Sequence, residues 1–175
     1  MAVGGSEDAE CSRLSDQVQL IDKYGKVSNR KPISQPRAKM GLAVGELRSE
    51  ANAQFRKTFI YAFGGVDIAG NPIRICEKYN VRANIWQSLP NLQVARHSAS
   101  GTTMGDSLYV FGGVGGATFI EKLNLKLNML RSPADRFEVI EPKLPQASSD
   151  IGLISSLSPT EILIAGGFSA ENRSI

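Results

Sequence analysis

The side chains that most often carry out catalysis are scarce in this sequence. His97 is the single histidine among 175 residues, and no nucleophile or carboxylate stands at a fixed spacing that would make it a general base. A histidine that opens a strand of small residues is more often a packing or hydrogen-bonding group. The sequence therefore predicts no catalytic residue, no metal site and no bound cofactor.

A glycine-rich segment at 112–116 has the composition of a phosphate-binding loop. It lacks the Gly-Lys-Ser/Thr sequence that completes such a loop, and no helical pattern follows whose N-terminus would hold the anion. The end of a strand followed by a loop explains the same glycines. We therefore interpret this segment as structural.

The overall composition limits the class of protein. Hydrophobic residues make up 42% and charged residues 21%, as in an ordinary globular domain. The apolar runs are shorter than the ~18 residues that cross a bilayer, and the N-terminus lacks the pattern of a signal peptide. Cys11 and Cys76 provide neither a disulfide framework nor a zinc set. We expect a cytoplasmic protein, with no membrane partner and, at a net charge of +3, no nucleic-acid partner.

Basic residues are concentrated in one stretch of the chain. Residues 23–45 contain no Asp or Glu. The basic residues in this stretch are Lys23, Lys26, Arg30, Lys31, Arg37 and Lys39. Two interpretations stay open: a solvated hairpin and loop, or a patch that binds an acidic partner or a phosphate-bearing surface.

Pairs of adjacent glycines recur at 4–5, 64–65, 112–113 and 166–167, about 50 residues apart. Each of the last three pairs directly follows a short apolar run. Such a run closed by glycine is typical of a β-strand buried on both faces. Glycine suits this place because it adopts positive φ at no steric cost and lets another backbone approach closely.

Each glycine pair is followed by a second strand pattern, clearest at 73–79, where Trp86 lies in the strand predicted after a short turn. We expect Trp86 to be largely buried, so that Trp86→Ala costs about 3–5 kcal/mol. Two other copies of the pattern have Ser28 and Leu130 at the tryptophan position. In the later copy we expect Phe137 to serve instead.

A Leu-Pro pair occurs twice, at 89–90 and 144–145. One constant shift superposes the segment 96–113 on 150–167. This shift places Asp150 on Arg96 and Ile151 on His97. A match of this length indicates that the chain is built from repeats.

These features resemble the kelch motif family, most closely over residues 59–113. The resemblance rests on glycine pairs after apolar strands, on Tyr79-Asn80 with Trp86, and on Leu-Pro before Arg96-His97. It implies four antiparallel strands per blade, stacked around the channel of a β-propeller. Kelch domains mostly bind other proteins, often through the loops after the glycine pair and before the innermost strand.

The resemblance predicts an all-β fold, a kelch-type β-propeller segment of about three four-stranded blades in an open arc. An insertion at 46–58 separates two inner strands. Residues 1–175 form one domain, divided into a partial blade 1–36, a repeat 37–95, a repeat 96–146 and a partial repeat 147–175. Strands are expected near 18–22, 26–30, 40–44, 59–63, 74–79, 84–88, 98–103, 107–111, 119–124, 137–140, 151–157 and 161–165.

The predicted function is that of a non-catalytic scaffold for protein–protein interaction. Loops on a rigid scaffold commonly carry binding residues, so the segments 67–72 and 114–118 and the region around residues 96–97 are candidates. The residues expected to face a partner are Asp67, Asn71, Arg96 and His97. The alternative is part of a propeller enzyme, or a sugar-binding propeller, that acts on a small ligand in the central channel.

About three blades do not surround a packed axis, because closed propellers have four to eight blades. The expected arc would leave apolar blade faces bare, and such faces associate or aggregate. We expect either that the chain is a fragment of a longer propeller or that two copies self-associate to complete a six-bladed ring.

Overall fold

The computed structural model describes residues 1–49, 52–116, 118–125, 136–141, 143–144 and 148–169. Every regular element in these ranges is a β-strand, and they contain no helix that could cross a membrane. In chain order the strands are β1 Ala2–Ser6, β2 Leu14–Ile21, β3 Val27–Arg30, β4 Gly41–Ser49, β5 Asn52–Phe63, β6 Cys76–Asn80, β7 Ile85–Leu89, β8 Ser100–Met104, β9 Ser107–Phe111, β10 Ile120–Asn124, β11 Glu138–Ile140, β12 Ser148–Ser149, β13 Leu153–Ser156, β14 Ile162–Ala165 and β15 Phe168–Ser169.

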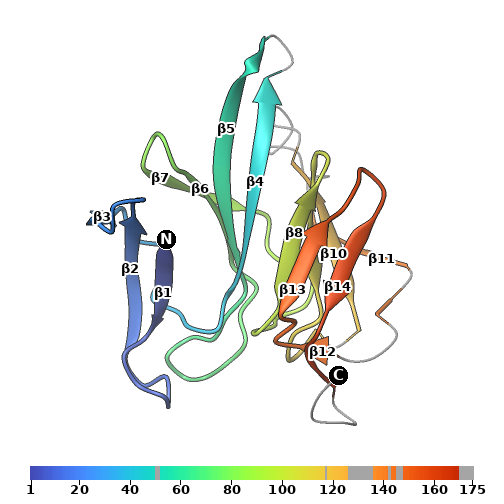
Figure 1. Cartoon of the computed structure of the whole chain (residues 1–175). Coiled ribbons are helices and arrows are strands. Elements are labelled where there is room, and N and C mark those ends of the chain that lie inside the picture. Colours follow the sequence, from blue (N-terminus) through green and yellow to red (C-terminus); the bar gives the residue numbers. More distant parts are fainter. Residues whose placement is uncertain (50–51, 117, 126–135, 142, 145–147, 170–175) are drawn as a thin grey trace.

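The strands form antiparallel sheets that stand side by side like blades (Figure 1). Two sheets have four strands, in the orders β4-β5-β6-β7 and β8-β9-β10-β11. The sheet β1-β2-β3 precedes them and the pair β13-β14 follows them, while β12 and β15 form a short ladder. The inner strands β4, β8 and β13 are neighbours, and the sheets do not close into a ring. The predicted all-β propeller segment in an open arc is therefore confirmed.

The hydrophobic core lies between the two four-stranded sheets. The second strand of each sheet carries apolar side chains on both faces, as the runs before the glycine pairs predicted. Phe63 of β5 and Leu108 of β9 are fully buried, and both belong to one cluster that spans the two sheets. Phe137 joins this cluster and is buried, as expected, whereas Leu130 lies outside the described residues.

The insertion at 46–58 lengthens two strands rather than adding a separate loop. β4 and β5 continue past the level of the other blades, with Glu46 paired to Thr58 and Arg48 paired to Arg56. The resulting hairpin projects from the end of its sheet (Figure 1). Because the added residues continue an existing ladder, the inner part of the blade keeps its register.

Trp86 is half-buried, so the expectation that it is largely buried was wrong. It lies on β7, the outermost strand of its sheet, where one face of the ring meets solvent. Its indole packs against the ring of Tyr79, with the centroids 4.9 Å apart, and its Nε1 donates a hydrogen bond of 2.9 Å to the carbonyl of Lys31. Trp86 therefore joins two neighbouring sheets at the outer rim instead of filling the core.

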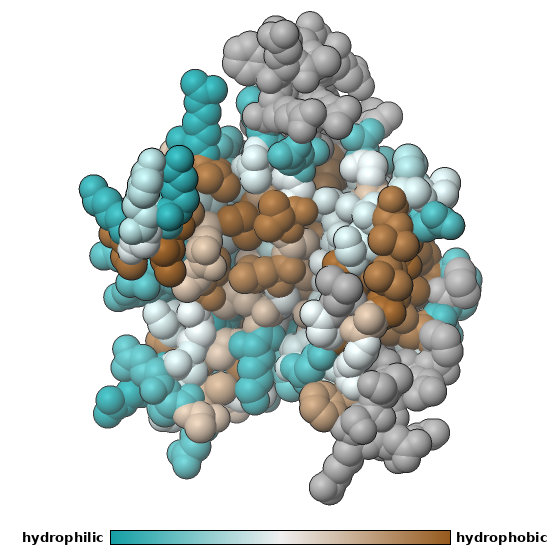
Figure 2. Space-filling model, in the orientation of Figure 1, coloured by the Kyte–Doolittle hydropathy of each residue, from teal (hydrophilic) through white to brown (hydrophobic). Residues whose placement is uncertain are grey.

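Apolar side chains remain uncovered on the inner strand β4 and at the C-terminal side of the arc. Leu42 and Val44 of β4 are exposed, as are Leu163 and Ile164 of β14. Figure 2 shows hydrophobic surface over both strands. Among the described residues, β14 pairs with a strand on one edge, whereas its counterparts β5 and β9 pair on both.

We expect the purified chain to self-associate, because these apolar faces and the free edge of β14 favour contact between copies. Multi-angle light scattering should give a molar mass of at least about twice 18.9 kDa. The Leu163→Lys variant should shift the distribution towards the monomer. Leu157→Lys, in the exposed turn before β14, is the matched control and should not. A monomer with a sharp thermal transition would contradict this expectation.

Because Trp86 is half-buried, its removal should lower the free energy of unfolding by less than the removal of a fully buried tryptophan. Trp86→Ala should destabilise the fold by about 1–2 kcal/mol, below the range for a fully buried tryptophan. Trp86→Phe keeps the contact with Tyr79 and loses the hydrogen bond to Lys31, so about 1 kcal/mol should be lost. Urea denaturation measures both, and a loss above about 4 kcal/mol for Trp86→Ala would show that the tryptophan belongs to the core.

Candidate functional site

Loops that enter the inner strands meet loops that leave the second strands at one end of the sheets. Ala38, before β4, exchanges backbone hydrogen bonds of 2.8 and 3.3 Å with Val66, after β5. His97, before β8, exchanges a matching pair of 2.9 and 3.1 Å with Val114, after β9. We call this end, with residues 38–39, 66, 97–98, 114 and 150, the mouth.

Three residues of the mouth have left-handed backbone although none is glycine. Lys39, Ser98 and Asp150 have φ values of 53°, 52° and 49°. Such a conformation costs on the order of 1–3 kcal/mol and persists where the surroundings fix it. Here the amide of Ser98 donates to the carbonyl of Lys39 (2.8 Å), and the amide of Asp150 donates to the carbonyl of Ser98 (3.0 Å). These bonds connect three successive blades.

Asp150 occupies the position of Ser98, not that of Arg96 as the constant shift predicted. Ile151 packs against the second glycine of its repeat, as the residue after Ser98 does in the preceding repeat. Gly152 is then an extra residue before the inner strand β13. This single addition changes the alignment of the repeats and brings a carboxylate to the mouth.

A pocket of about 370 Å³ opens between the loops of the mouth. Lys39 and Asp150 contribute its charged groups. The remaining lining residues are Met40, Ser98, Ala99, Ser100 and Ile151. The pocket therefore offers a cation, an anion and hydroxyl groups over a floor of small and apolar side chains.

His97 is electrostatically coupled to both charged groups of the pocket. Burial lowers the pKa of His97, the positive charge of Lys39 lowers it further, and Asp150 opposes the shift. The net shift favours the neutral imidazole, whose Nδ1 lies 3.3 Å from the hydroxyl of Ser98. A neutral imidazole and a hydroxyl exchange hydrogen bonds with polar groups of a ligand.

Arg96 does not face a partner, and that prediction was wrong. Its side chain has no exposed surface, and its Nη2 pairs with the buried carboxylate of Glu121 on β10. Its Nη1 donates to the carbonyls of Gly112 (2.9 Å) and Phe119 (3.1 Å). Burial lowers the pKa of Arg96, and the charge of Glu121 opposes this shift. The guanidinium therefore connects the loop before β8 with β10 and with the loop between β9 and β10.

Arg37 repeats this arrangement in the preceding blade, so it is not part of a basic surface. Its Nη2 lies 2.9 Å from the carboxylate of Glu77 on β6, and both side chains are buried. Burial lowers the pKa of Arg37, and Glu77 opposes this shift. Among the described residues, the Nε and Nη1 of Arg37 have no hydrogen-bond partner, so this guanidinium is less fully satisfied than that of Arg96.

The glycine pairs connect each blade to the arginine of the next. The amide of Gly65 donates to the carbonyl of Arg96 (2.9 Å), and the amide of Gly5 donates to the carbonyl of Arg37 (3.0 Å). Gly64 has a φ of +61°, and a Cβ there would lie 2.3 Å from the Arg96 carbonyl oxygen. A side chain at this position would therefore separate the blades.

Asp67 and Asn71 lie in the loop between β5 and β6. Asp67 is half-buried, and its Oδ1 accepts backbone hydrogen bonds of 2.9 Å from both Ala69 and Asn71. Asn71 is exposed, and Ile68 at the tip of the loop is strongly exposed. The carboxylate of Asp67 thus shapes the loop, while its neighbours are free to contact a partner.

Of the predicted binding residues, the structure brings His97 into the mouth and removes Arg96 to the interior. Ser98 and Asp150 were not predicted as site residues, and Lys39 was considered only as part of the basic stretch 23–45. Their common signal is their place directly before a strand of small residues in three successive repeats. Finding this signal requires the alignment of Asp150 with Ser98 and Lys39. The extra residue Gly152 hides that alignment, because it shifts the strand that follows by one position.

The described residues contain no group of three or more His, Cys, Asp or Glu side chains placed to hold a metal ion. The arrangement at the mouth is suited to recognition, because its charged groups are exposed at an open surface.

The sheets define this chain as a segment of a β-propeller, and a solved structure with the same fold agrees. The chain matches the structure of YjhT with a TM-score of 0.70 and 13% sequence identity, over 97% of this chain and 50% of that chain. The chain thus spans half of that structure.

Sequence comparison identifies the kind of blade. Residues 48–93 match the Kelch motif. A segment of 54 residues, which is 31% of this chain, is 35% identical to Kelch-like protein 38 of Danio rerio. A segment of the same length is 39% identical to F-box/kelch-repeat protein SKIP11 of Arabidopsis thaliana. The matched segment spans 9% and 12% of those proteins. These matches support the kelch resemblance that the sequence predicted, over the matched segment of the chain.

The contribution of the buried pair Arg96–Glu121 to the stability of the fold can be tested by substitution. Arg96→Met should destabilise the fold by about 3–5 kcal/mol, because it leaves the Glu121 carboxylate buried without its partner. Chemical denaturation measures the loss, with Arg82→Met at an exposed turn as the control.

The double variant Arg96→Met/Glu121→Leu should recover a large part of that loss, because it removes the unpaired charge. A double variant less stable than Arg96→Met would show that the pair does not act as described.

Proposed function

We propose that this chain is a non-catalytic scaffold that binds a protein partner at the mouth. Kelch repeats commonly serve as protein-interaction scaffolds, and the chain carries such repeats. One observation supports the mouth as the site. Lys39, Ser98 and Asp150 hold strained left-handed backbone around an open pocket, and strain of this kind is concentrated at functional sites.

The chemistry of the pocket suits a polypeptide with both kinds of charge. Lys39 attracts a carboxylate, whereas Asp150 accepts hydrogen bonds from a cationic side chain or a backbone amide. A volume of about 370 Å³ suits one or two side chains of a partner's loop. The exposed Ile68, in the β5–β6 loop that also contains Val66 of the mouth, offers an apolar side chain to the same partner.

A small ligand is the alternative occupant of the same pocket. The hydroxyls of Ser98 and Ser100 and the carboxylate of Asp150 resemble the groups that bind sugar hydroxyls, and their pocket is of ligand size. A glycan-binding assay and a hydrolase and oxidase panel address this alternative directly.

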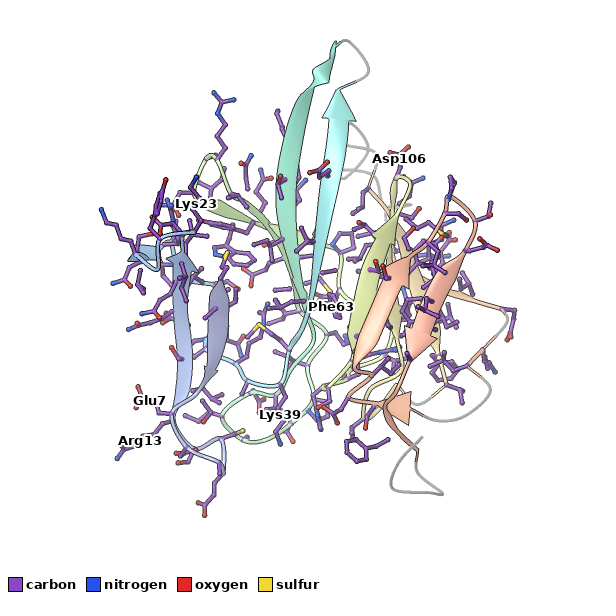
Figure 3. All side chains as sticks on the ribbon, viewed as in Figure 1. Glu7, Arg13, Lys23, Lys39, Phe63 and Asp106 are labelled. Atoms are coloured by element: carbon purple, nitrogen blue, oxygen red, sulfur yellow. The ribbon has the colours of Figure 1, made fainter. Side chains whose placement is uncertain are left out.

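Capture from cell extract with quantitative mass spectrometry tests the proposal. Lys39→Glu and Asp150→Lys should each reduce recovery of the partner about ten-fold or more, because each places the wrong charge against it. Lys57→Glu and Asp106→Lys are matched controls, and Figure 3 shows Asp106 at the end of the sheets opposite to Lys39.

The controls should leave recovery unchanged. Equal recovery with all four variants would contradict the mouth as the binding site. Saturable glycan binding that the mouth variants abolish, without a captured protein, would favour the small-ligand alternative.

A further inference from the structure

A second polar surface lies at the other end of the sheets from the mouth. It consists of Lys23, Lys26, Arg30 and Lys31 around the β2–β3 hairpin, with Arg82 in the neighbouring β6–β7 turn. We call these five residues the basic hairpin surface. Lys23, Lys26, Lys31 and Arg82 are exposed and Arg30 is half-buried. Figure 3 shows Lys23 at the upper end of its sheet and Lys39 at the lower end of the arc.

The positive charge of this surface is not neutralised by its surroundings. Within the described part of the chain, none of the five basic residues forms a salt bridge. The hairpin carries one carboxylate at its turn, Asp22, whose Oδ1 accepts hydrogen bonds from the amides of Tyr24 (2.8 Å) and Lys26 (3.0 Å). That carboxylate orders the turn, so the neighbouring cations are presented to solvent.

The hairpin is fixed to the next blade by its backbone. The carbonyl of Lys31 accepts the hydrogen bond from Trp86, and its amide donates to the Oδ1 of Asn84 (3.0 Å). The hydroxyl of Tyr79 donates to the same oxygen at 2.7 Å. The cations of two blades therefore stand on one rigid frame, which lowers the entropy lost on binding.

Apolar side chains accompany the cations. Ile21 and Val27 are a cross-strand pair in the hairpin and are 54% and 52% exposed. Tyr24 at the turn is 83% exposed, with the Nζ of Lys23 4.9 Å from its ring centroid. Three apolar groups exposed together at one hairpin are unfavourable in water. A polypeptide ligand would cover these groups and would also pair with the cations.

We propose that the basic hairpin surface binds an acidic segment of a partner protein that carries apolar side chains. Carboxylates of the segment pair with Lys23 and Lys26, and its apolar side chains cover Ile21 and Val27. Among the described residues, β3 is the outermost strand of its sheet, so its free edge is open to an extended segment. The site is separate from the mouth and adds a second contact to the scaffold.

The proposal is tested with a fluorescein-labelled peptide of Glu and Asp residues around a central Leu-Phe pair, by fluorescence anisotropy with the full chain. Lys23→Glu/Lys26→Glu should weaken binding at least about ten-fold. Ile21→Ser should weaken it several-fold, since the apolar contact is lost. Lys57→Glu/Lys143→Glu has the same charge change at other exposed sites and should bind like the parent.

The remaining outcomes decide between partners. Lys39→Glu at the mouth should leave peptide binding unchanged, which separates this site from the proposed function. Equal weakening by both double variants would overturn the proposal, because it would show an effect of net charge. Tighter binding of phosphatidylserine vesicles or of polyuridine RNA than of the peptide would also overturn it. Circular dichroism and thermal unfolding confirm that each variant is folded.

Discussion

A buried arginine before the inner strand is the interaction on which each complete blade depends. The guanidinium of Arg96 reaches the third strand of its own blade through Glu121, while its carbonyl accepts a hydrogen bond from Gly65 of the preceding blade. The carboxylate of Glu121 also accepts hydrogen bonds from the amides of Gln93 and Val94 in the incoming loop. Removing two charges from water is costly, and this set of bonds offsets that cost.

The same arginine determines where the mouth lies. Since its side chain points into the blade and its carbonyl is held by the neighbouring blade, the two residues that follow emerge at the surface with fixed backbone. His97 and Ser98 are placed in this way, and Lys39 is placed likewise by Arg37. A buried structural residue is thus followed directly by residues at the surface, which is why a prediction based on sequence position alone assigned Arg96 to the wrong group.

The strands were predictable because their signals are local. Apolar runs, alternation and closing glycines act over a few residues, and these located the core strands and the position of the insertion, although not its extension of β4 and β5 as a hairpin. The roles of single polar residues were not predictable, because they depend on distant partners: the burial of Arg96 requires Glu121 from a later strand. The position of Trp86 depends on where its strand lies in the sheet. The role of Asp150 depends on one additional residue, which the repeat pattern could not locate.

The mouth combines a nearly symmetric backbone with unlike side chains. Lys39, Ser98 and Asp150 are related by the repeat and have φ values within a few degrees of one another, yet they carry positive, neutral and negative groups. The rotation that relates one blade to the next therefore superposes the backbone of these three residues but places a different charge at each position. A ligand at this end meets an electric dipole with a definite direction, so one rotational orientation is favoured over the others. The charge at the mouth thus differs from blade to blade although the backbone repeats.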